Sequence, residues 1–387
     1  MTTSVAPSRP AGGRSRPARG FLRDLDRPAD VFRHLGPNWY ASVMGTGIVA
    51  NAAAVVPLHV TGLRVFGTIV WALATFLLVA LTAAWAVHWV RYPRIARAHA
   101  HHPVMGHFWG APAMALMTVG AGTLSLGRDW IGVTAAVRVD AVLWTAGTLL
   151  GLITAVWIPY LAMTEHEVGD DSAFGGWLMP VVPPMVSAAT GAALVPHVAA
   201  GQPRLTLLLA CYAMFGISLF AGLVVISQIW SRLVRHKPGP AATVPTVWIV
   251  LGPLGQSVTA ANALGSVAGL ALPRPYAEGA EVFGVVYGVP AWGFAMVWLV
   301  LAASLTLRTA RRHLPFTLTW WSFTFPVGTC VTGTCALAVR LRSEALDAAS
   351  AALYLLLLAA WSTVAARTLR GCFLGTLFLP PAAASGR

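Results

Sequence analysis

Ten long stretches of this sequence contain no Asp, Glu, Lys or Arg, and this pattern constrains the fold more than any other feature. The stretches cover residues 39–63, 65–90, 98–127, 141–164, 172–203, 205–231, 238–273, 282–307, 313–339 and 348–366. A helix needs about 20 consecutive apolar residues to cross a bilayer. Charged residues make up only 10% of the chain, compared with about 25% in soluble domains. The sequence therefore predicts an all-α integral membrane protein, with about ten transmembrane helices in one domain over residues 35–371.

The basic residues divide unevenly between the two sides of such a domain. When the helices are threaded in order, 19 of the 26 Lys and Arg residues fall on the side of the N-terminus. The positive-inside rule then places both termini in the cytoplasm, which agrees with an even number of helices. We expect a multi-pass protein of the plasma membrane, in contact with membrane lipid. It would have a disordered cytoplasmic N-terminal tail over residues 1–34 and a short C-terminal tail over residues 372–387. Although the net charge is +13, we expect no nucleic-acid partner, because the basic residues lie at helix ends and form no single surface.

Glycine and proline interrupt every second apolar stretch, with Pro159 and Pro290 as exceptions in the smoother stretches. The interrupting residues that we expect to line a path are Gly45, Gly47, Pro112, Pro183, Pro253, Gly255, Pro326 and Gly328. Interrupted backbone at membrane depth is tolerated where it is buried in protein or lines a cavity. The pattern predicts five helical hairpins, with interrupted helices around a central pore and smoother helices facing lipid. The alternative is that each such residue serves only close packing or kinking, for which Gly and Pro are common in membrane helices.

The lining expected for such a pore is polar but has no charge. Residues 316–334 combine breaks with many hydroxyls, and Asn51, Gln256 and Asn262 add amides. No stretch has a central acidic residue, which argues against a proton relay or an acid-lined cation path. The N-terminal ends of interrupted helices carry partial positive charge and attract anions weakly. Conduction requires such weak binding, because the ion must also leave. A small inorganic or carboxylate anion is therefore the expected substrate, with Thr46, Gln256 and Thr329 as polar positions along its path.

Histidines and cysteines offer a weaker alternative. His99, His101 and His102 lie close together, with His107 just behind, but no Cys or carboxylate is near them in the sequence. A membrane metalloprotein or haem protein stays open on this basis, although the pattern alone predicts no metal site and no cofactor. No nucleotide-binding or nucleophile motif is found, so we expect neither an enzyme nor ATP-driven transport. A purely structural or sensory membrane protein is the third possibility.

Several of these motifs resemble the tellurite-resistance/dicarboxylate transporter family, which includes plant slow anion channels, bacterial tellurite-resistance proteins, fungal malic acid permeases and fungal sulfite efflux pumps. The motif W-W-S-F-T-F-P at 320–326 carries the resemblance, together with W-Y-A-S-V-M-G-T-G-I at 39–48. The resemblance covers residues 35–370 and implies ten helices as five hairpins around a pore, assembled as a homotrimer. It also implies that Phe316, four residues before Trp320, is the hydrophobic gate of the pore.

Within this family, the motifs favour sulfite-type efflux. L-G-P-L-G-Q at 251–256 and F-W-G-A-P-A-M at 108–114 are similar to the sulfite pumps. W-L-M-P-V-V-P-P-M at 177–185 instead resembles the malic acid permeases. A C4-dicarboxylate such as malate is therefore the alternative substrate.

Overall fold

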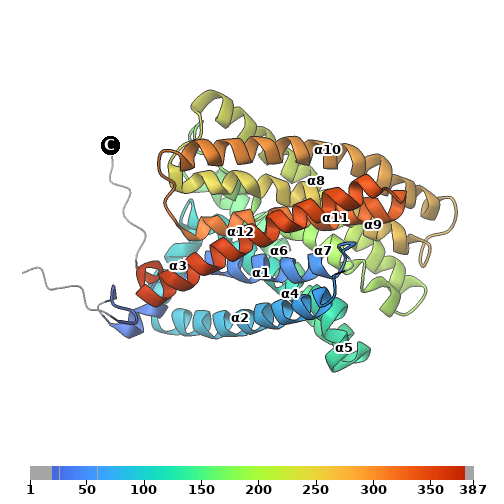
Figure 1. The fold of residues 1–387 in the computed structure, drawn as a ribbon, viewed down its shortest axis with the longest axis horizontal. Helices are drawn as coiled ribbons and strands as arrows, with labels where there is room; N and C mark the ends of the chain where they lie inside the picture. The colour runs from blue at the N-terminus through green and yellow to red at the C-terminus, as the bar shows by residue number, and fades with distance from the viewer. Residues whose placement is uncertain (1–19, 26, 59, 380–387) are drawn as a thin grey trace, which may run out of the picture.

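The computed structural model describes residues 20–25, 27–58 and 60–379, and this part of the chain is helical without any β-strand (Figure 1). The helices are α1 (Tyr40–Ala53), α2 (Leu63–Arg91), α3 (Pro93–His101), α4 (Gly110–Gly122), α5 (Arg128–Ile131), α6 (Val133–Thr164), α7 (Pro183–Gly191), α8 (Gln202–His236), α9 (Leu251–Ala268), α10 (Tyr276–Ala310), α11 (Phe325–Leu341) and α12 (Glu344–Leu374). Shorter 3₁₀ turns and one π-helical turn connect or extend them.

Five long helices form the outside of the molecule. They are α2, α6, α8, α10 and α12, and the most apolar window of each is only 22–33% buried. Their exposed positions carry large aliphatic and aromatic side chains, as a surface in contact with lipid requires. Together with residues 241–268 and 318–341, they make seven helical stretches among the described residues that are long and apolar enough to cross a membrane.

Five shorter helices, α1, α4, α7, α9 and α11, lie inside this layer and are almost entirely buried. These are the most interrupted segments of the sequence, although the outer helices α6 and α10 also contain an internal proline, Pro159 and Pro290. Helices α1, α4 and α7 have 14, 13 and 9 residues, which is less than a membrane crossing needs.

Local sequence explains why the inner helices are short. A 3₁₀ turn precedes α9 over Ala241–Val250, and another precedes α11 over Leu318–Phe323. Pro183 and Pro326 lie in the first turns of α7 and α11, where the missing N–H of proline costs no helical hydrogen bond. These two prolines therefore begin helices and do not kink them.

The two ends of the described chain meet at one end of the helical body (Figure 1). The backbone N–H groups of Leu22 and Asp24 donate to the carbonyl oxygens of Phe373 and Leu374, at 2.8 and 3.1 Å. Residues 28–32 form a 3₁₀ turn, so this part of the segment expected as a disordered tail has defined structure. Helix α12 likewise continues past residue 371 into the expected C-terminal tail. The remainder of both expected tails, residues 1–19 and 380–387, lies outside the described residues.

Candidate functional site: a polar vestibule closed by an aromatic side chain

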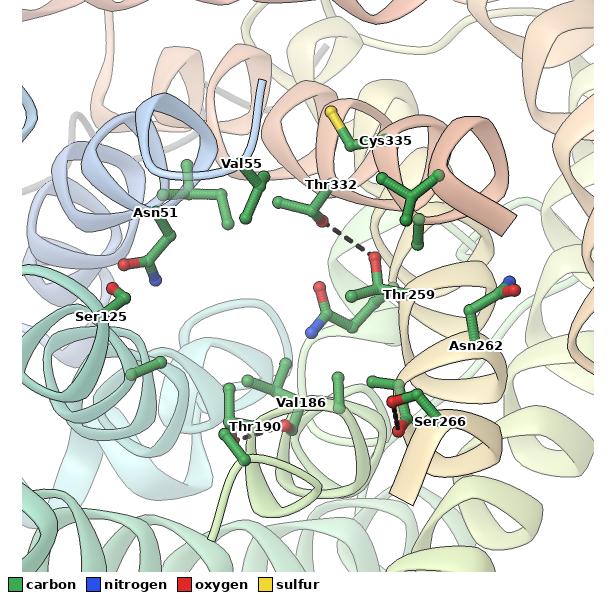
Figure 2. Close-up of a pocket in the computed structure, with 18 of the residues that line it drawn as sticks. Asn51, Val55, Ser125, Val186, Thr190, Thr259, Asn262, Ser266, Thr332 and Cys335 are labelled. Atoms are coloured by element: carbon green, nitrogen blue, oxygen red, sulfur yellow. Dashed lines mark hydrogen bonds between the residues drawn. The ribbon is translucent and has the colours of Figure 1, made fainter. Parts of the chain in front are cut away.

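A cavity of about 690 Å³ lies among the five inner helices, each of which contributes to its wall. Figure 2 shows the labelled side chains around an open centre, with Asn51 and Ser125 on one wall and Thr259 and Thr332 on the facing wall. We call this cavity the vestibule. Because every inner helix supplies a wall, helices far apart in the sequence are required to build it.

The vestibule opens toward the end of the molecule that lies away from the described termini. Its rim includes Val339, Arg340 and Arg342, at or just past the C-terminal end of α11. Its inner part includes Phe325, the first residue of the same helix. The cavity therefore extends along most of α11.

Phe325 separates the vestibule from a second, much smaller cavity. It lines both cavities, and its side chain is only 2% exposed. The small cavity has a volume of about 20 Å³ and lies toward the end with the termini. Its other walls are largely apolar and come from Ala41, Met44, Phe108, Met114, Met179, Val182, Ile249, Leu318, Trp321, Ser322 and Pro326. A buried aromatic ring thus lies between a wide polar cavity and a narrow apolar one.

All three amides expected in the lining, Asn51, Gln256 and Asn262, reach the vestibule, but few of the expected helix-breaking residues reach either cavity. Gln256 lines the vestibule, and Pro326 lines the small cavity. Pro112, Pro183 and Pro253 line neither of them.

The four expected glycines pack helices together. A Cβ atom added to Gly45 would lie 2.2 Å from the Thr324 hydroxyl, and one added to Gly328 would lie 2.4 Å from the side chain of Ile48. A Cβ on Gly255 would lie 2.5 Å from the backbone nitrogen of Cys330 on α11. A Cβ added to Gly47 would lie 2.7 Å from the side chain of Thr118 on α4. At these positions the packing interpretation fits the structure, and the glycines narrow the distance between inner helices.

Thr46 and Thr329 also point away from the vestibule. The indole N–H of Trp361 on α12 donates to the Thr46 hydroxyl at 3.2 Å. The Thr329 hydroxyl donates to the carbonyl oxygen of Pro326 at 2.7 Å, within its own helix. Both side chains are buried and bonded, so neither offers a free polar group to a solute in this conformation.

Phe316 lies outside both cavities. It precedes the Leu318–Phe323 turn and packs edge-to-face on Trp320, with ring centroids 5.4 Å apart. It packs against the hydrophobic cluster at the termini end of the molecule, which includes Leu35 and Trp39. The residue that the structure brings to the constriction is Phe325, in the same motif. Its position where the helix resumes before Pro326 is the sequence signal that could have identified it.

The vestibule wall is rich in amides and hydroxyls. The amide nitrogen of Asn51 donates to the carbonyl oxygen of Thr118 at 3.1 Å, and that of Asn262 donates to Gly284 on α10 at 2.9 Å. Gln256 is only 5% exposed, and its carbonyl Oε1 has no hydrogen-bond partner among the described residues. Its amide can therefore turn an N–H toward a solute in the cavity. The hydroxyls of Thr259 and Thr332 bond each other at 2.8 Å across the α9–α11 contact (Figure 2).

The charges at the vestibule are positive and lie at its mouth. Arg340 and Arg342 are its charged lining residues, and no Asp or Glu is among the described residues of its wall. Arg340 pairs with Glu281 on α10, with an N–O distance of 3.3 Å, whereas Arg342 forms no ion pair with a described residue. Helices α7 and α11 begin beside the small cavity, and helix N-termini carry partial positive charge. The site can therefore attract an anion at its mouth and bind it weakly inside.

The histidines form no comparable site. His88 and His99 stack with ring centroids 5.5 Å apart, and His101 pairs with Glu165 at 3.3 Å. Within residues 20–25, 27–58 and 60–379, no three His, Cys, Asp or Glu side chains are arranged to hold a metal ion.

The fold and the vestibule define a helical membrane transport protein whose inner helices enclose a polar cavity with a basic mouth. Residues 34–369 match the family of voltage-dependent anion channels (SLAC1), and the chain belongs to this family. The resemblance noted in the sequence motifs is thereby confirmed.

Three relatives illustrate the range of the family. An uncharacterized transporter of Methanocaldococcus jannaschii is 26% identical over 362 residues, which cover 92% of this chain and 99% of the relative. The sulfite efflux pump SSU1 of Arthroderma otae is 27% identical over 343 residues, covering 86% and 89% of the two chains. The malic acid transport protein of Schizosaccharomyces pombe is 24% identical over 327 residues, covering 76% and 68%.

Proposed function

We propose that this protein moves sulfite or a closely similar small anion across the plasma membrane, in the direction of efflux. The observation that carries the proposal is the vestibule, a wide cavity with amides and hydroxyls inside, arginines at its mouth and no carboxylate on its described wall. Membership of an anion channel family and the likeness to the sulfite efflux pumps support it. Weak binding by neutral donors suits a conducted anion, since tight binding would prevent exit.

The path that we propose runs from the vestibule past Phe325 into the small apolar cavity and on to the end with the termini. Phe325 blocks this path as a hydrophobic plug, in the place that sequence reasoning assigned to Phe316. Opening then requires the Phe325 ring to rotate away, which would join the two cavities whose walls it shares. A hydrophobic constriction of this kind controls passage by excluding water and solvated ions.

The membrane arrangement that we propose has ten crossing segments in five hairpins, each of an inner helix and the outer helix that follows. Helices α1, α4 and α7 cross with the help of the turns that flank them, because a buried inner segment need not be a continuous helix. Both termini lie in the cytoplasm, so the vestibule opens to the outside. We also propose a homotrimer with one path in each subunit, as the resemblance to the family implies.

Malate is the second candidate substrate, and the likeness to the malic acid transport protein favours it. The charge distribution argues for the smaller anion. Two carboxylates require two sets of donors or cations at once, whereas the described basic residues of the vestibule are both at its mouth. Deeper in the cavity, a dicarboxylate would meet only neutral groups.

A competition flux assay tests the proposal. Purified protein in proteoliposomes is loaded with sulfite, and efflux is followed with malate, chloride or nitrate as external competitor. We expect sulfite flux well above that of empty vesicles and weak competition by malate. Malate flux that exceeds sulfite flux would favour the second candidate. Absence of any anion flux, also from a Phe325→Ala variant that removes the plug, would contradict transport itself.

A further inference from the structure

A groove on the outer surface of the molecule is separate from the vestibule. It lies between the C-terminal parts of α6 and α8 and has a volume of about 490 Å³. Met163 and Val224 contribute to its walls and are 83% and 58% exposed. Both helices belong to the outer layer, so the groove faces the lipid side of the membrane domain.

The groove changes from apolar to charged along α8. Val224 and Val225 line its apolar part, whereas Ser231, Arg232 and Arg235 line its other part, near the end of the helix. With a rise of 1.5 Å per residue, Val224 and Arg235 are about 16 Å apart along the axis. This length is sufficient to hold the upper part of an acyl chain and the headgroup above it.

Two arginines at the polar part are available to a phosphate. Arg232 donates from its Nε to the carbonyl oxygen of Asp171 at 3.1 Å, which fixes the side chain, and its terminal nitrogens lie beside Gly239 without a hydrogen-bond partner among the described residues. Neither Arg232 nor Arg235 forms an ion pair with a described residue. Asp170 also lines this part and is exposed. A ligand that carries both signs of charge therefore fits better than one with negative charge alone.

The base of the groove contains a buried polar side chain. His107 lines the groove, is 6% exposed and stacks on Trp177 with ring centroids 5.9 Å apart. Its Nδ1 atom has no hydrogen-bond partner among the described residues. An unpaired buried nitrogen is unfavourable.

We propose that this groove binds one phospholipid with an ethanolamine headgroup. An acyl chain lies along Met163, Val224 and Val225, the phosphate is held by Arg232 and Arg235, and the ammonium group lies at Asp170. The polar part of the groove is at the end that carries most of the basic residues, where the positive-inside rule places the cytoplasmic leaflet. The lipid would join α6 to α8 next to the loop that leads into α7.

Native mass spectrometry on full-length protein from nanodiscs tests this assignment. The lipids are phosphatidylethanolamine, phosphatidylglycerol and phosphatidylcholine with identical acyl chains. We expect Arg232→Gln/Arg235→Gln to reduce bound phosphatidylethanolamine at least about tenfold, since each basic residue near a lipid surface contributes severalfold to affinity. The matched control is the double variant Arg94→Gln/Arg97→Gln, which changes two exposed arginines on α3 outside the groove. This control should bind lipid as the unchanged protein does.

Two further variants make the outcome decisive. Asp170→Asn should remove the preference for phosphatidylethanolamine over phosphatidylcholine, and Val224→Trp should displace the lipid by filling the apolar part of the groove. Equal lipid binding by the double arginine variant and its control would overturn the proposal, as would a preference for phosphatidylglycerol in the unchanged protein. A change of oligomeric mass in the groove variants, without loss of lipid, would show that a second copy of the chain occupies the groove.

Discussion

At the scale of single residues, Phe316 and Phe325, two of the three phenylalanines of the 316–326 segment, have different environments. Phe325 separates the vestibule from the small cavity, whereas Phe316 packs on Trp320 outside both. Only a side chain on the path can obstruct it. The two residues are therefore a matched pair for locating the gate.

Phe325→Ala should raise anion flux in proteoliposomes at least tenfold, because it removes the ring that separates the two cavities. Phe316→Ala should leave flux within about twofold of the unchanged protein, since Phe316 packs on Trp320 in the hydrophobic cluster at the termini end and lines neither cavity. The measurement is stopped-flow sulfite efflux at equal protein density in the vesicles. A flux increase in Phe316→Ala, with none in Phe325→Ala, would return the gate to the position expected from the sequence motif.

Gln256→Leu should lower flux severalfold in a Phe325→Ala background, where the plug no longer limits it. The substitution keeps the volume of the side chain and removes the free amide donor of the inner vestibule. Thr329→Val is the matched control, since the Thr329 hydroxyl is bonded within its own helix and does not line the cavity. Equal flux in the two variants would show that Gln256 does not contact the anion.

The protonation of His99 affects the stability of the folded protein. Burial, together with the charges of His88, His34 and His102, lowers the pKa of His99 from 6.5 to about 4. The folded protein therefore keeps His99 uncharged, while the unfolded chain binds a proton below pH 6.5. The contribution of His99 to the unfolding free energy is fully present above pH 6.5 and falls as the pH decreases toward 4.

The thermal midpoint in detergent should accordingly fall between pH 7 and pH 5, and His99→Gln should reduce that fall. The quantity to compare is the change of the thermal midpoint with pH in the unchanged protein and in His99→Gln. His34 also has a lowered pKa, and it contributes equally to both proteins. Parallel slopes would show that His99 is protonated alike in the folded and unfolded states.

At the scale of elements, glycine contacts set the spacing of the inner helices. Gly255 brings α9 against the backbone of α11, where an added Cβ would be 2.5 Å from the Cys330 nitrogen. In a membrane, where lipid is as apolar as the helix surface, close packing of small residues is a main source of helix association. The shape of the vestibule depends on this contact, because α9 and α11 both line it.

Gly255→Ala should destabilise the protein by about 1–3 kcal/mol, since backbone atoms on α11 would have to move. Gly269→Ala is the control, because an added Cβ at Gly269 meets no atom within 4 Å and its backbone is helical. The control should be neutral or slightly stabilising, as Ala is the better helix former by about 1 kcal/mol. Denaturant unfolding in detergent measures both, and equal midpoints would show that the α9–α11 contact can relax at no cost.

At the scale of the whole molecule, the arrangement in the membrane follows from the two ends of the helical body. The vestibule mouth with Val339 lies at one end, and α3 lies at the other with the described termini. A Val339→Cys substitution should react with a membrane-impermeant maleimide on intact cells. Arg94→Cys on α3 should react only after the cells are opened. Reversed labelling would invert the proposed orientation, while leaving the fold unchanged.

The sequence by itself determined the class of fold and the separation of inner from outer helices. Long uncharged apolar stretches predict membrane helices, and a high density of Gly and Pro predicts segments buried among other helices, so these properties are local. It also identified Asn51, Gln256 and Asn262 among the polar lining. The sequence of a single segment does not determine which side of a buried helix faces the cavity, because a helix that is buried on all sides has no apolar periodicity.

Only the tertiary structure decided which side of each buried helix faces the cavity. It placed Gly45, Gly255 and Gly328 at contacts between helices and Thr46 beside Trp361, and it placed Phe325, but not Phe316, between the two cavities. Each of these outcomes depends on how five helices from distant parts of the chain are rotated against one another. That rotation is set by which small residues allow the closest contact between neighbouring backbones, and no single segment contains this information.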